Sequence, residues 1–151
     1  MKLTSSAFQH GSPIPAIYTC DGKDLSPPLL WADVPEGAQS FILICDDPDA
    51  PRGTWTHWVV YNIPAEVREL NEGMPTTDTL ANGASQGMND FKRVGYGGPC
   101  PPSGTHRYFF RLYALDSRLR LQPRAERAEV DHDMDGHVLA LGELMGTYRR
   151  K

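Results

Sequence analysis

The stretch SFILIC, residues 40–45, is the segment from which the fold can be worked out. This continuous apolar run lies between turn residues, which is the pattern of a β-strand buried on both faces. Two more strands are predicted from their β-branched and aromatic residues, one over Trp58–Ile63, closed by Pro64, and one over His106–Leu115. In the last strand the two-residue period places one set of side chains on the same face, namely His106, Tyr108, Phe110 and Leu112.

The segments around these strands complete the fold class. Leu29–Trp31 is predicted to be a short strand, and Met74–Gly98 is expected to be mostly loop with one short strand at most. Near the C-terminus apolar residues recur at three- and four-residue steps, which indicates an amphipathic helix that Gly136 can divide into two; they are Val130, Met134, Val138, Leu141, Met145 and Tyr148. We therefore predict a mainly β fold with a peripheral C-terminal helix or helices, and a Greek-key β-sandwich is the natural way to close such strands.

Composition sets the class of protein. The chain of 151 residues, with 40% hydrophobic and 23% charged residues, is expected to form one domain over residues 1–151. Its 13 prolines and 14 glycines indicate many turns, which favours β structure. The net charge is −4 and there is no basic stripe, so we expect no nucleic-acid partner.

Compartment and redox state follow from the N-terminus and the cysteines. The N-terminus lacks the apolar core of a signal peptide, and no apolar run approaches the length of a membrane span. We therefore expect a cytoplasmic protein without stable membrane insertion. Cys20, Cys45 and Cys100 are odd in number and widely spaced, without a C-x-x-C pair. This pattern indicates neither a disulfide framework nor a zinc site, and we predict free thiols.

Two segments carry the chemistry, and the first directly follows the buried strand. It reads DDPDAP over residues 46–51 and continues as WTHW over residues 55–58. Pro48 and Pro51 stiffen the chain, so the carboxylates are held in place, and the Ala50–Pro51 bond is a candidate for the cis form. His57 lies between two indoles, which would shield it from water.

The second segment reads GYGGPCPPSGTHRY over residues 95–108. Its glycines offer backbone N–H groups to an anion, and its prolines hold the loop in shape. If the two segments meet, they form a small pocket with two imidazoles, a phenol, backbone donors and a carboxylate. Such a pocket suits a phosphate or a carboxylate, while its aspartate suits an ammonium, so a zwitterionic head-group such as phosphoethanolamine would match both halves.

Both segments resemble the signature motifs of the phosphatidylethanolamine-binding protein family, in its bacterial and archaeal Raf-kinase-inhibitor-like branch. The first motif is matched by Asp47–Pro51 with His57 and Trp58, and the second by Gly95–Tyr108. Further matches follow the family's order along nearly the whole chain; they are Tyr18–Gly22, Ser26–Trp31, Gly136–Ala140 and Gly146–Tyr148. The resemblance implies a large central sheet packed on a smaller one, with an anion pocket at one end.

The resemblance also implies site residues and partners. Carried over position by position, the pocket is lined by Asp47, His57, Gly98, His106 and Tyr108, with Pro51 and Trp55 at its rim. Asp49 is expected to brace the loop instead. The family implies a non-catalytic protein that binds phosphate, phosphorylated head-groups or small carboxylates, without cofactor or metal. It allows a protein partner such as a kinase or a protease, and it favours a homodimer.

Other interpretations of these residues stay open. Taken singly, the proline-rich turn, the glycine–proline loop and each histidine are more often structural than functional. The pocket could hydrolyse a phosphoester by acid–base catalysis, with Cys100 nearby in the loop. Asp47, His57 and His106 could instead bind zinc or iron.

The C-terminal helical pattern has its own alternatives. His132 and His137 lie among aspartates and are expected to belong to a solvated acidic face rather than to a metal site. Leu139 and Leu144 widen the apolar side of the expected helix, which could serve a homodimer.

Overall fold

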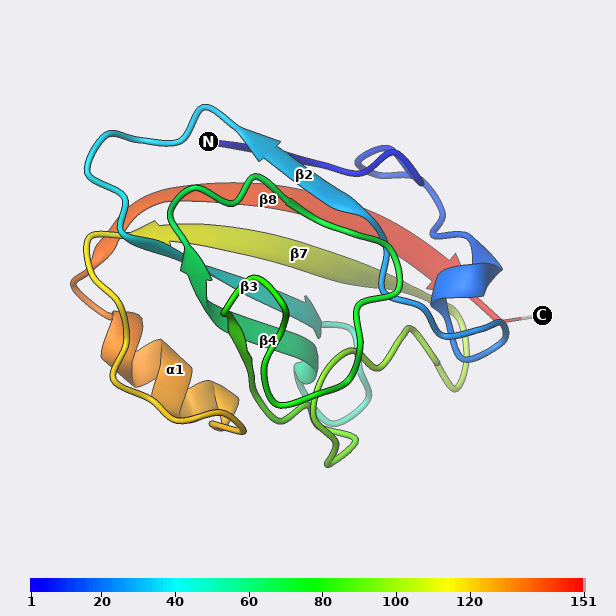
Figure 1. Cartoon of the computed structure of the whole chain (residues 1–151). Coiled ribbons are helices and arrows are strands. Elements are labelled where there is room, and N and C mark those ends of the chain that lie inside the picture. The colour runs from blue at the N-terminus through cyan, green and yellow to red at the C-terminus, as the bar shows by residue number, and fades with distance from the viewer. Residues whose placement is uncertain (151) are drawn as a thin grey trace.

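The computed structural model describes residues 1–150, which form two antiparallel sheets and one α-helix (Figure 1). The five-stranded sheet has the order β6-β4-β3-β7-β8, with β3 (Ser40–Asp47), β4 (Trp55–Pro64), β6 (Ser85–Gln86), β7 (Thr105–Leu115) and β8 (Val138–Arg149). The three-stranded sheet has the order β1-β2-β5, with β1 (Lys2–Thr4), β2 (Leu29–Ala32) and β5 (Glu69–Leu70). The helices are the short 3-10 helix η1 (Ala16–Tyr18) and α1 (Arg127–Met134). The predicted mainly β fold with a large and a small sheet is confirmed.

Two apolar clusters cover the two faces of the five-stranded sheet. One lies between the sheets and includes Trp31 of β2, Phe41 of β3 and Phe110 of β7. The other lies under α1 and joins Ile42 of β3 to Val130 of α1. Figure 1 shows α1 on one side of this sheet and β2 on the other. Successive residues of a strand point to opposite faces, so an apolar run without alternation is what a strand covered on both faces requires. All eight residues of β3 are buried, as predicted for this strand.

The C-terminal segment differs from the prediction. Only Arg127–Met134 is helical, and Val138–Arg149 is a strand, β8, paired with β7 along its whole length. The inner face of β8 carries small residues because the N-terminal segment crosses close to it. A Cβ on Gly146 would lie 2.5 Å from Cγ1 of Ile14, and one on Gly142 would lie 3.3 Å from the carbonyl oxygen of Met1. The prediction of a second helix, and of a dimer face on it, is therefore wrong: Leu144 is buried and Leu139 is exposed on β8.

The cysteine prediction is wrong for two of the three residues. Cys20 and Cys100 form a disulfide across a sequence separation of 80 residues, and Cys45 is the free, buried cysteine of the described chain. The peptide bonds within residues 1–150 are all trans, so the expected cis bond at Ala50–Pro51 is also wrong. No helix in this part of the chain is long and apolar enough to cross a membrane.

The segment Met74–Gly98, between β5 and β7, is mostly loop, as predicted, with the two-residue strand β6. Gln86 of β6 anchors it. Its side chain accepts a hydrogen bond from Nε1 of Trp58 at 2.7 Å and donates to the carbonyl oxygens of Pro75 and Thr77, each at 2.8 Å. Because the amide is fully buried and bonded at both ends, the loop is held against β4 and its later residues reach the end of the sheet.

Candidate functional site

The two chemistry-bearing segments meet at one end of the five-stranded sheet. β3 runs antiparallel to both β4 and β7, so the C-terminal end of β3 lies beside the N-terminal ends of its two neighbours. There they surround a cavity of about 200 Å³. Its lining residues are Asp47, Ala50, Pro51, Trp55, His57, Phe91, Cys100, Pro101, Pro102, His106 and Tyr108. Six of the seven predicted site residues are therefore brought together, and Gly98 is the exception. The volume of the cavity limits it to a small ligand.

His57 is buried at the start of β4 and tied to the opposite loop. Its Nδ1 lies 2.6 Å from the carbonyl oxygen of Gly97. A carbonyl only accepts hydrogen bonds, so Nδ1 carries the hydrogen. The ring packs edge-on against Phe91 and Tyr108, with centroids 5.3 Å from each. Burial lowers the pKa of His57, and the bond to Gly97 and the charge of Asp47 oppose this only in part. The imidazole is therefore neutral at neutral pH.

His106 and Asp47 form a buried pair across β7 and β3. Nδ1 of His106 lies 2.6 Å from Oδ2 of Asp47, and both side chains are less than a tenth exposed. The other oxygen of Asp47, Oδ1, accepts the backbone N–H of Asp49 at 2.8 Å. The carboxylate is thus fixed by two bonds and orients the imidazole toward the cavity. The turn after β3 was predicted to hold this carboxylate, and it does so by the hydrogen bond from the backbone N–H of Asp49.

The hydroxyl group of Tyr108 is buried and has no hydrogen-bond partner within residues 1–150. Its side chain is fully buried between the two imidazole rings, and it lines the cavity. Burial, and next the charge of Asp47, whose carboxylate lies close to the hydroxyl group, raise the pKa of this phenol, so it keeps its proton and can donate. A buried polar group without a partner costs about 1–3 kcal/mol, so this hydroxyl group, on a residue of the cavity lining, is a candidate donor to a ligand or a bound water.

The rim of the cavity is apolar and partly unforeseen. Trp55 is 38% exposed, and its ring stands edge-on to Phe91 at 5.5 Å between centroids. Pro51 lies on the same rim, as predicted. Phe91 was missed by the sequence interpretation because a lone aromatic residue in a long polar loop carries no periodic signal. Its place between Trp55 and His57 makes it the wall that shields the imidazole from water.

Gly98 lies outside the lining of the cavity. Its N–H donates to Oδ1 of Asp24 at 2.8 Å, so it is already used within the protein. A Cβ at this position would lie 2.4 Å from both Oδ1 of Asp24 and the carbonyl oxygen of Tyr18. The glycine is required for close approach of two loops rather than for contact with a ligand.

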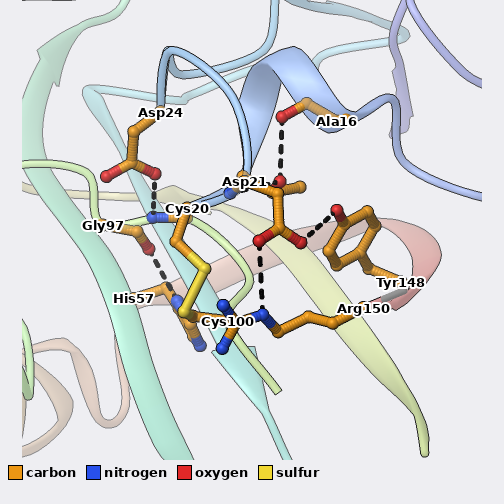
Figure 2. The surroundings of a disulfide bond; sticks show 11 residues. Ala16, Cys20, Asp21, Asp24, His57, Gly97, Cys100, Tyr148 and Arg150 are labelled. Atoms are coloured by element: carbon orange, nitrogen blue, oxygen red, sulfur yellow. Dashed lines mark hydrogen bonds and ion pairs between the residues drawn. A yellow bond between two sulfur atoms is a disulfide. The ribbon is translucent and has the colours of Figure 1, made fainter. Parts of the chain in front are cut away.

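The same two loops are joined by the disulfide (Figure 2). Cys100 lines the cavity, while Cys20 donates its N–H to the carbonyl oxygen of Pro99 at 3.1 Å. Beside it, Asp21 accepts hydrogen bonds from Tyr148 at 2.6 Å and from Arg150 at 3.2 Å, which Figure 2 shows. The wall at Cys100–Pro102 is therefore attached to the segment after η1 and, through it, to the end of β8.

The remaining carboxylates near the site are paired outside the cavity. Asp49 forms two hydrogen bonds of 2.9 Å with the guanidinium of Arg107, which lowers its pKa to about 2. This ion pair braces the loop, as expected. Asp46 faces the opposite side of the sheet and binds Arg127 at 2.6 Å and Arg111 at 3.2 Å. Over residues 1–150, the lining of the cavity contains neither lysine nor arginine.

The structure offers no support for a metal site. Within residues 1–150, no group of three or more His, Cys, Asp or Glu side chains is arranged to hold a metal ion, and this includes Asp47, His57 and His106. His132 lies on α1, whereas His137 follows the helix and pairs with Asp116 at 2.8 Å. Cys100 is in a disulfide and therefore has no thiol to act as a nucleophile.

Known proteins resemble the chain over nearly its whole length. Residues 4–149 match the family model described as phosphatidylethanolamine-binding protein. A UPF0098 protein of Methanothermobacter thermautotrophicus is 54% identical over 150 residues, which cover 99% of both chains. A UPF0098 protein of Aquifex aeolicus is also 54% identical, over 153 residues that cover 99% of this chain and 89% of the relative.

Solved structures give the same result. CT736 of Chlamydia trachomatis, described as a homologue of the phosphatidylethanolamine-binding protein, has a TM-score of 0.92 and 44% identity, covering 99% of this chain and 97% of that one. YbcL of E. coli, described as a new member of the mammalian family, has a TM-score of 0.92 and 35% identity, covering 99% and 98%. Sequence and fold agree, and the chain belongs to the phosphatidylethanolamine-binding protein family.

Proposed function

We propose that the protein is a non-catalytic binding protein whose cavity holds a small oxyanion: a phosphate, a phosphorylated head-group such as phosphoethanolamine, or a small carboxylate. The observation that carries this proposal is the buried hydroxyl group of Tyr108, a residue of the cavity lining, which has no hydrogen-bond partner in the described part of the chain. A protonated phenol donates to an oxyanion, which would satisfy this otherwise costly group.

The other lining residues support a head-group rather than a whole lipid. Asp47 is the carboxylate of the lining and would accept the ammonium of a zwitterionic ligand. Trp55, Phe91 and the prolines give the short ethylene chain of phosphoethanolamine an apolar wall. About 200 Å³ accommodates a head-group but not two acyl chains.

Catalysis is the second candidate and has less support. A phosphoester hydrolase needs a nucleophile next to a base, or a base that holds a water molecule. Cys100 is in a disulfide, and Nδ1 of His106 is bonded to Asp47. Nε2 of His57 is the one ring position of that residue left for a proton transfer. Turnover of a generic phosphomonoester that is abolished in His57→Ala would establish the enzyme instead.

A protein partner also belongs to the proposal. Trp55 stands partly exposed at the rim, next to the ligand position, so the surface around it would change on occupancy and could be sensed by a partner such as a kinase or a protease. This idea first requires that bound phosphoethanolamine contacts Trp55, which NMR saturation transfer between the ligand and the indole ring would detect.

The test is a titration of the purified, metal-free protein with phosphoethanolamine, phosphate and acetate, followed by NMR of the histidine rings at about pH 6. We expect saturable shifts of His57 and His106 that are strongly weakened in Asp47→Asn and unchanged in the control Glu36→Gln, an exposed turn residue. Flat titration curves for all three ligands at millimolar concentration would refute the proposal.

A further inference from the structure

The described lining of the cavity carries no cationic side chain to meet an anion. Among residues 1–150 it contains one carboxylate, Asp47, and neither lysine nor arginine. Arg107 is paired with Asp49, and Arg111 and Arg127 are paired with Asp46 on the far side of the sheet. Arg52 is exposed after the rim residue Pro51, and Arg93 lies over the ring of Phe91, but neither is part of the lining. An anion entering this cavity would add a negative charge beside a buried carboxylate, which is strongly unfavourable in a low-dielectric site unless positive charge balances it. The ammonium of a zwitterionic ligand can balance Asp47, and a proton can balance the second charge of a phosphate dianion.

The hydrogen bond of His57 decides which ring nitrogen can receive that proton. Nδ1 is committed to the carbonyl oxygen of Gly97 at 2.6 Å and already carries a hydrogen. Nε2 has no protein partner within residues 1–150, and the residue lines the cavity. In the neutral ring, which burial favours by lowering the pKa of His57, Nε2 offers a lone pair. A lone pair facing an oxyanion is repulsive, but it becomes a strong hydrogen bond once a proton lies between them.

The groups packed around His57 include three carboxylates and a second histidine of the cavity lining, His106. Asp47 and Asp46 from β3 and Asp24 from the segment after η1 all act on it as negative charges. From β7 it meets Tyr108, which keeps its own proton, and His106, whose Nδ1 is bonded to Asp47. From the loop after β6 the ring contacts Phe91, which has no titratable group. Cys100 lines the same cavity and does not titrate either, because it is in the disulfide. These carboxylates favour a proton on Nε2 as soon as a ligand can share it.

We propose that the cavity takes up its oxyanion together with one proton, which is held between the ligand and Nε2 of His57. This inference rests on the proposed function. It makes the site selective for oxyanions that carry a proton near neutral pH, above all phosphomonoesters, over strongly acidic sulfate esters. A phosphomonoester loses its second proton at a pKa of about 6, so its monoanion brings the proton into the cavity.

The sign of the pH dependence follows. The complex contains one proton more than the free dianion and the free neutral site. Affinity for a phosphomonoester is therefore highest on the acid side and falls by about tenfold per pH unit once both the ligand and His57 are deprotonated. Below the second pKa of the ligand the monoanion supplies the proton, and little is taken from the solvent.

The test is calorimetry of the intact protein with phosphoethanolamine and with its sulfate ester analogue, ethanolamine O-sulfate. Each titration is run from about pH 5 to 8 in two phosphate-free buffers with different heats of ionisation, which yields the number of protons bound. For phosphoethanolamine we expect uptake to rise from near zero at pH 5 to about one at pH 8. For the sulfate ester, which cannot carry the proton, we expect uptake near one already at pH 7 and at least tenfold weaker binding than the phosphate ester.

Two variants and one spectroscopic measurement locate the proton. His57→Gln places an amide donor that does not titrate near the position of Nε2, so uptake should vanish and the affinity should lose its pH dependence. His137→Gln, which removes an exposed histidine far from the cavity, should behave as wild type. If His57→Gln does not fold, the 15N resonance of Nε2 in the wild type decides, because it must change from an unprotonated to a protonated nitrogen on binding.

The outcomes separate the two proposals. Binding of phosphoethanolamine without proton uptake at pH 8, affinity that does not change between pH 6 and 8, or protonation at His106 instead of His57 would overturn the proton-coupled site while leaving an anion pocket. Flat calorimetric traces for both ligands at every pH would remove the anion pocket and this inference with it.

Discussion

At the scale of single residues, the site is organised by which polar atoms are already bonded. Asp47 and His106 bind each other, and His57 binds Gly97, so one atom of each imidazole is fixed by the protein. The hydroxyl group of Tyr108 has no hydrogen-bond partner among the residues that the structure describes. The bonded Nδ1 atoms orient the two imidazole rings, and the polar atoms without a bond determine which donors and acceptors a ligand must supply.

Tyr108→Phe tests this description of the hydroxyl group. Because the phenol has no protein partner, its removal should leave the free energy of unfolding unchanged or raise it by up to about 1 kcal/mol, as measured by urea denaturation. The same change should weaken phosphoethanolamine binding by roughly tenfold or more, the value of a hydrogen bond to a charged group. Tyr113→Phe, on the half-buried face of the same strand that packs toward α1, is the matched control. A clear loss of stability in Tyr108→Phe would mean that the hydroxyl group is bonded within the protein.

Asp49 gives a prediction about acid stability. The hydrogen bonds from Arg107 hold its pKa at about 2, below the value of about 4 in an unfolded chain. A lowered pKa stabilises the folded state above the unfolded pKa, and this contribution is lost as pH falls toward 2. The difference in stability between wild type and Asp49→Asn should therefore be small at pH 7, since the pair is partly exposed, and should disappear near pH 2. Urea denaturation at several pH values measures it, and a difference that grows toward low pH would contradict the assignment.

At the scale of elements, one wall of the cavity is a loop without regular structure, and it is held by its attachments. The disulfide from Cys100 to Cys20 and the hydrogen bond from Gly98 to Asp24 both fasten it to the segment after η1. The other walls come from β3, β4 and β7 and are held by the sheet. The position of the loop wall around Cys100 therefore depends on a few individual attachments rather than on a sheet.

Removing the disulfide should therefore affect both stability and the site. The double variant Cys20→Ser, Cys100→Ser frees a loop of 80 residues in the unfolded chain and should lower the free energy of unfolding by about 2–4 kcal/mol. Phosphoethanolamine should bind more weakly as well, because Cys100–Pro102 lose their anchor. Thiol titration of the denatured, unreduced protein should find one reactive thiol, Cys45, and three after reduction. Three thiols before reduction would contradict the bond.

The elements also show what the sequence could and could not predict. The strands with strong apolar patterns, β3 and β7, were predictable because burial of both faces and alternation leave a direct trace in residue type. β8 was mistaken for a helix because its inner face needs glycine and alanine where the N-terminal segment crosses, so the alternation is hidden. The prolines and glycines of the two motifs identified the site, but neither the disulfide nor the role of Phe91 leaves any local signal.

At the scale of the whole molecule, the structure changes the surface on which a homodimer is expected. The homodimer implied by the family stays a prediction, but its contact surface is now the edge strand β8 instead of a second helix. The first half of β8 lies at the edge of the five-stranded sheet and carries exposed Val138, Leu139 and Leu141, the last of them 47% exposed. An edge strand with apolar side chains can pair with the same strand of a second copy.

Sedimentation of the wild type and of Leu141→Lys tests this surface. We expect a dimer at micromolar concentration that dissociates in the variant, with phosphoethanolamine binding unchanged because the strand end at Leu141 is remote from the cavity residues. A wild type that stays monomeric at all concentrations would contradict the dimer. The cytoplasmic location is likewise a prediction, and the disulfide bears on it, since such bonds persist in oxidising compartments and in the cytosol of hyperthermophiles.

The most direct measurement for the central claim is a crystal structure of the protein grown at about pH 6 with phosphoethanolamine. The account predicts one ligand in the cavity, with a phosphate oxygen within hydrogen-bond distance of the hydroxyl group of Tyr108, another facing Nε2 of His57, and the ammonium toward Asp47. A cavity filled only with water at saturating ligand, or a ligand bound elsewhere while the hydroxyl group of Tyr108 stays unpaired, would contradict it.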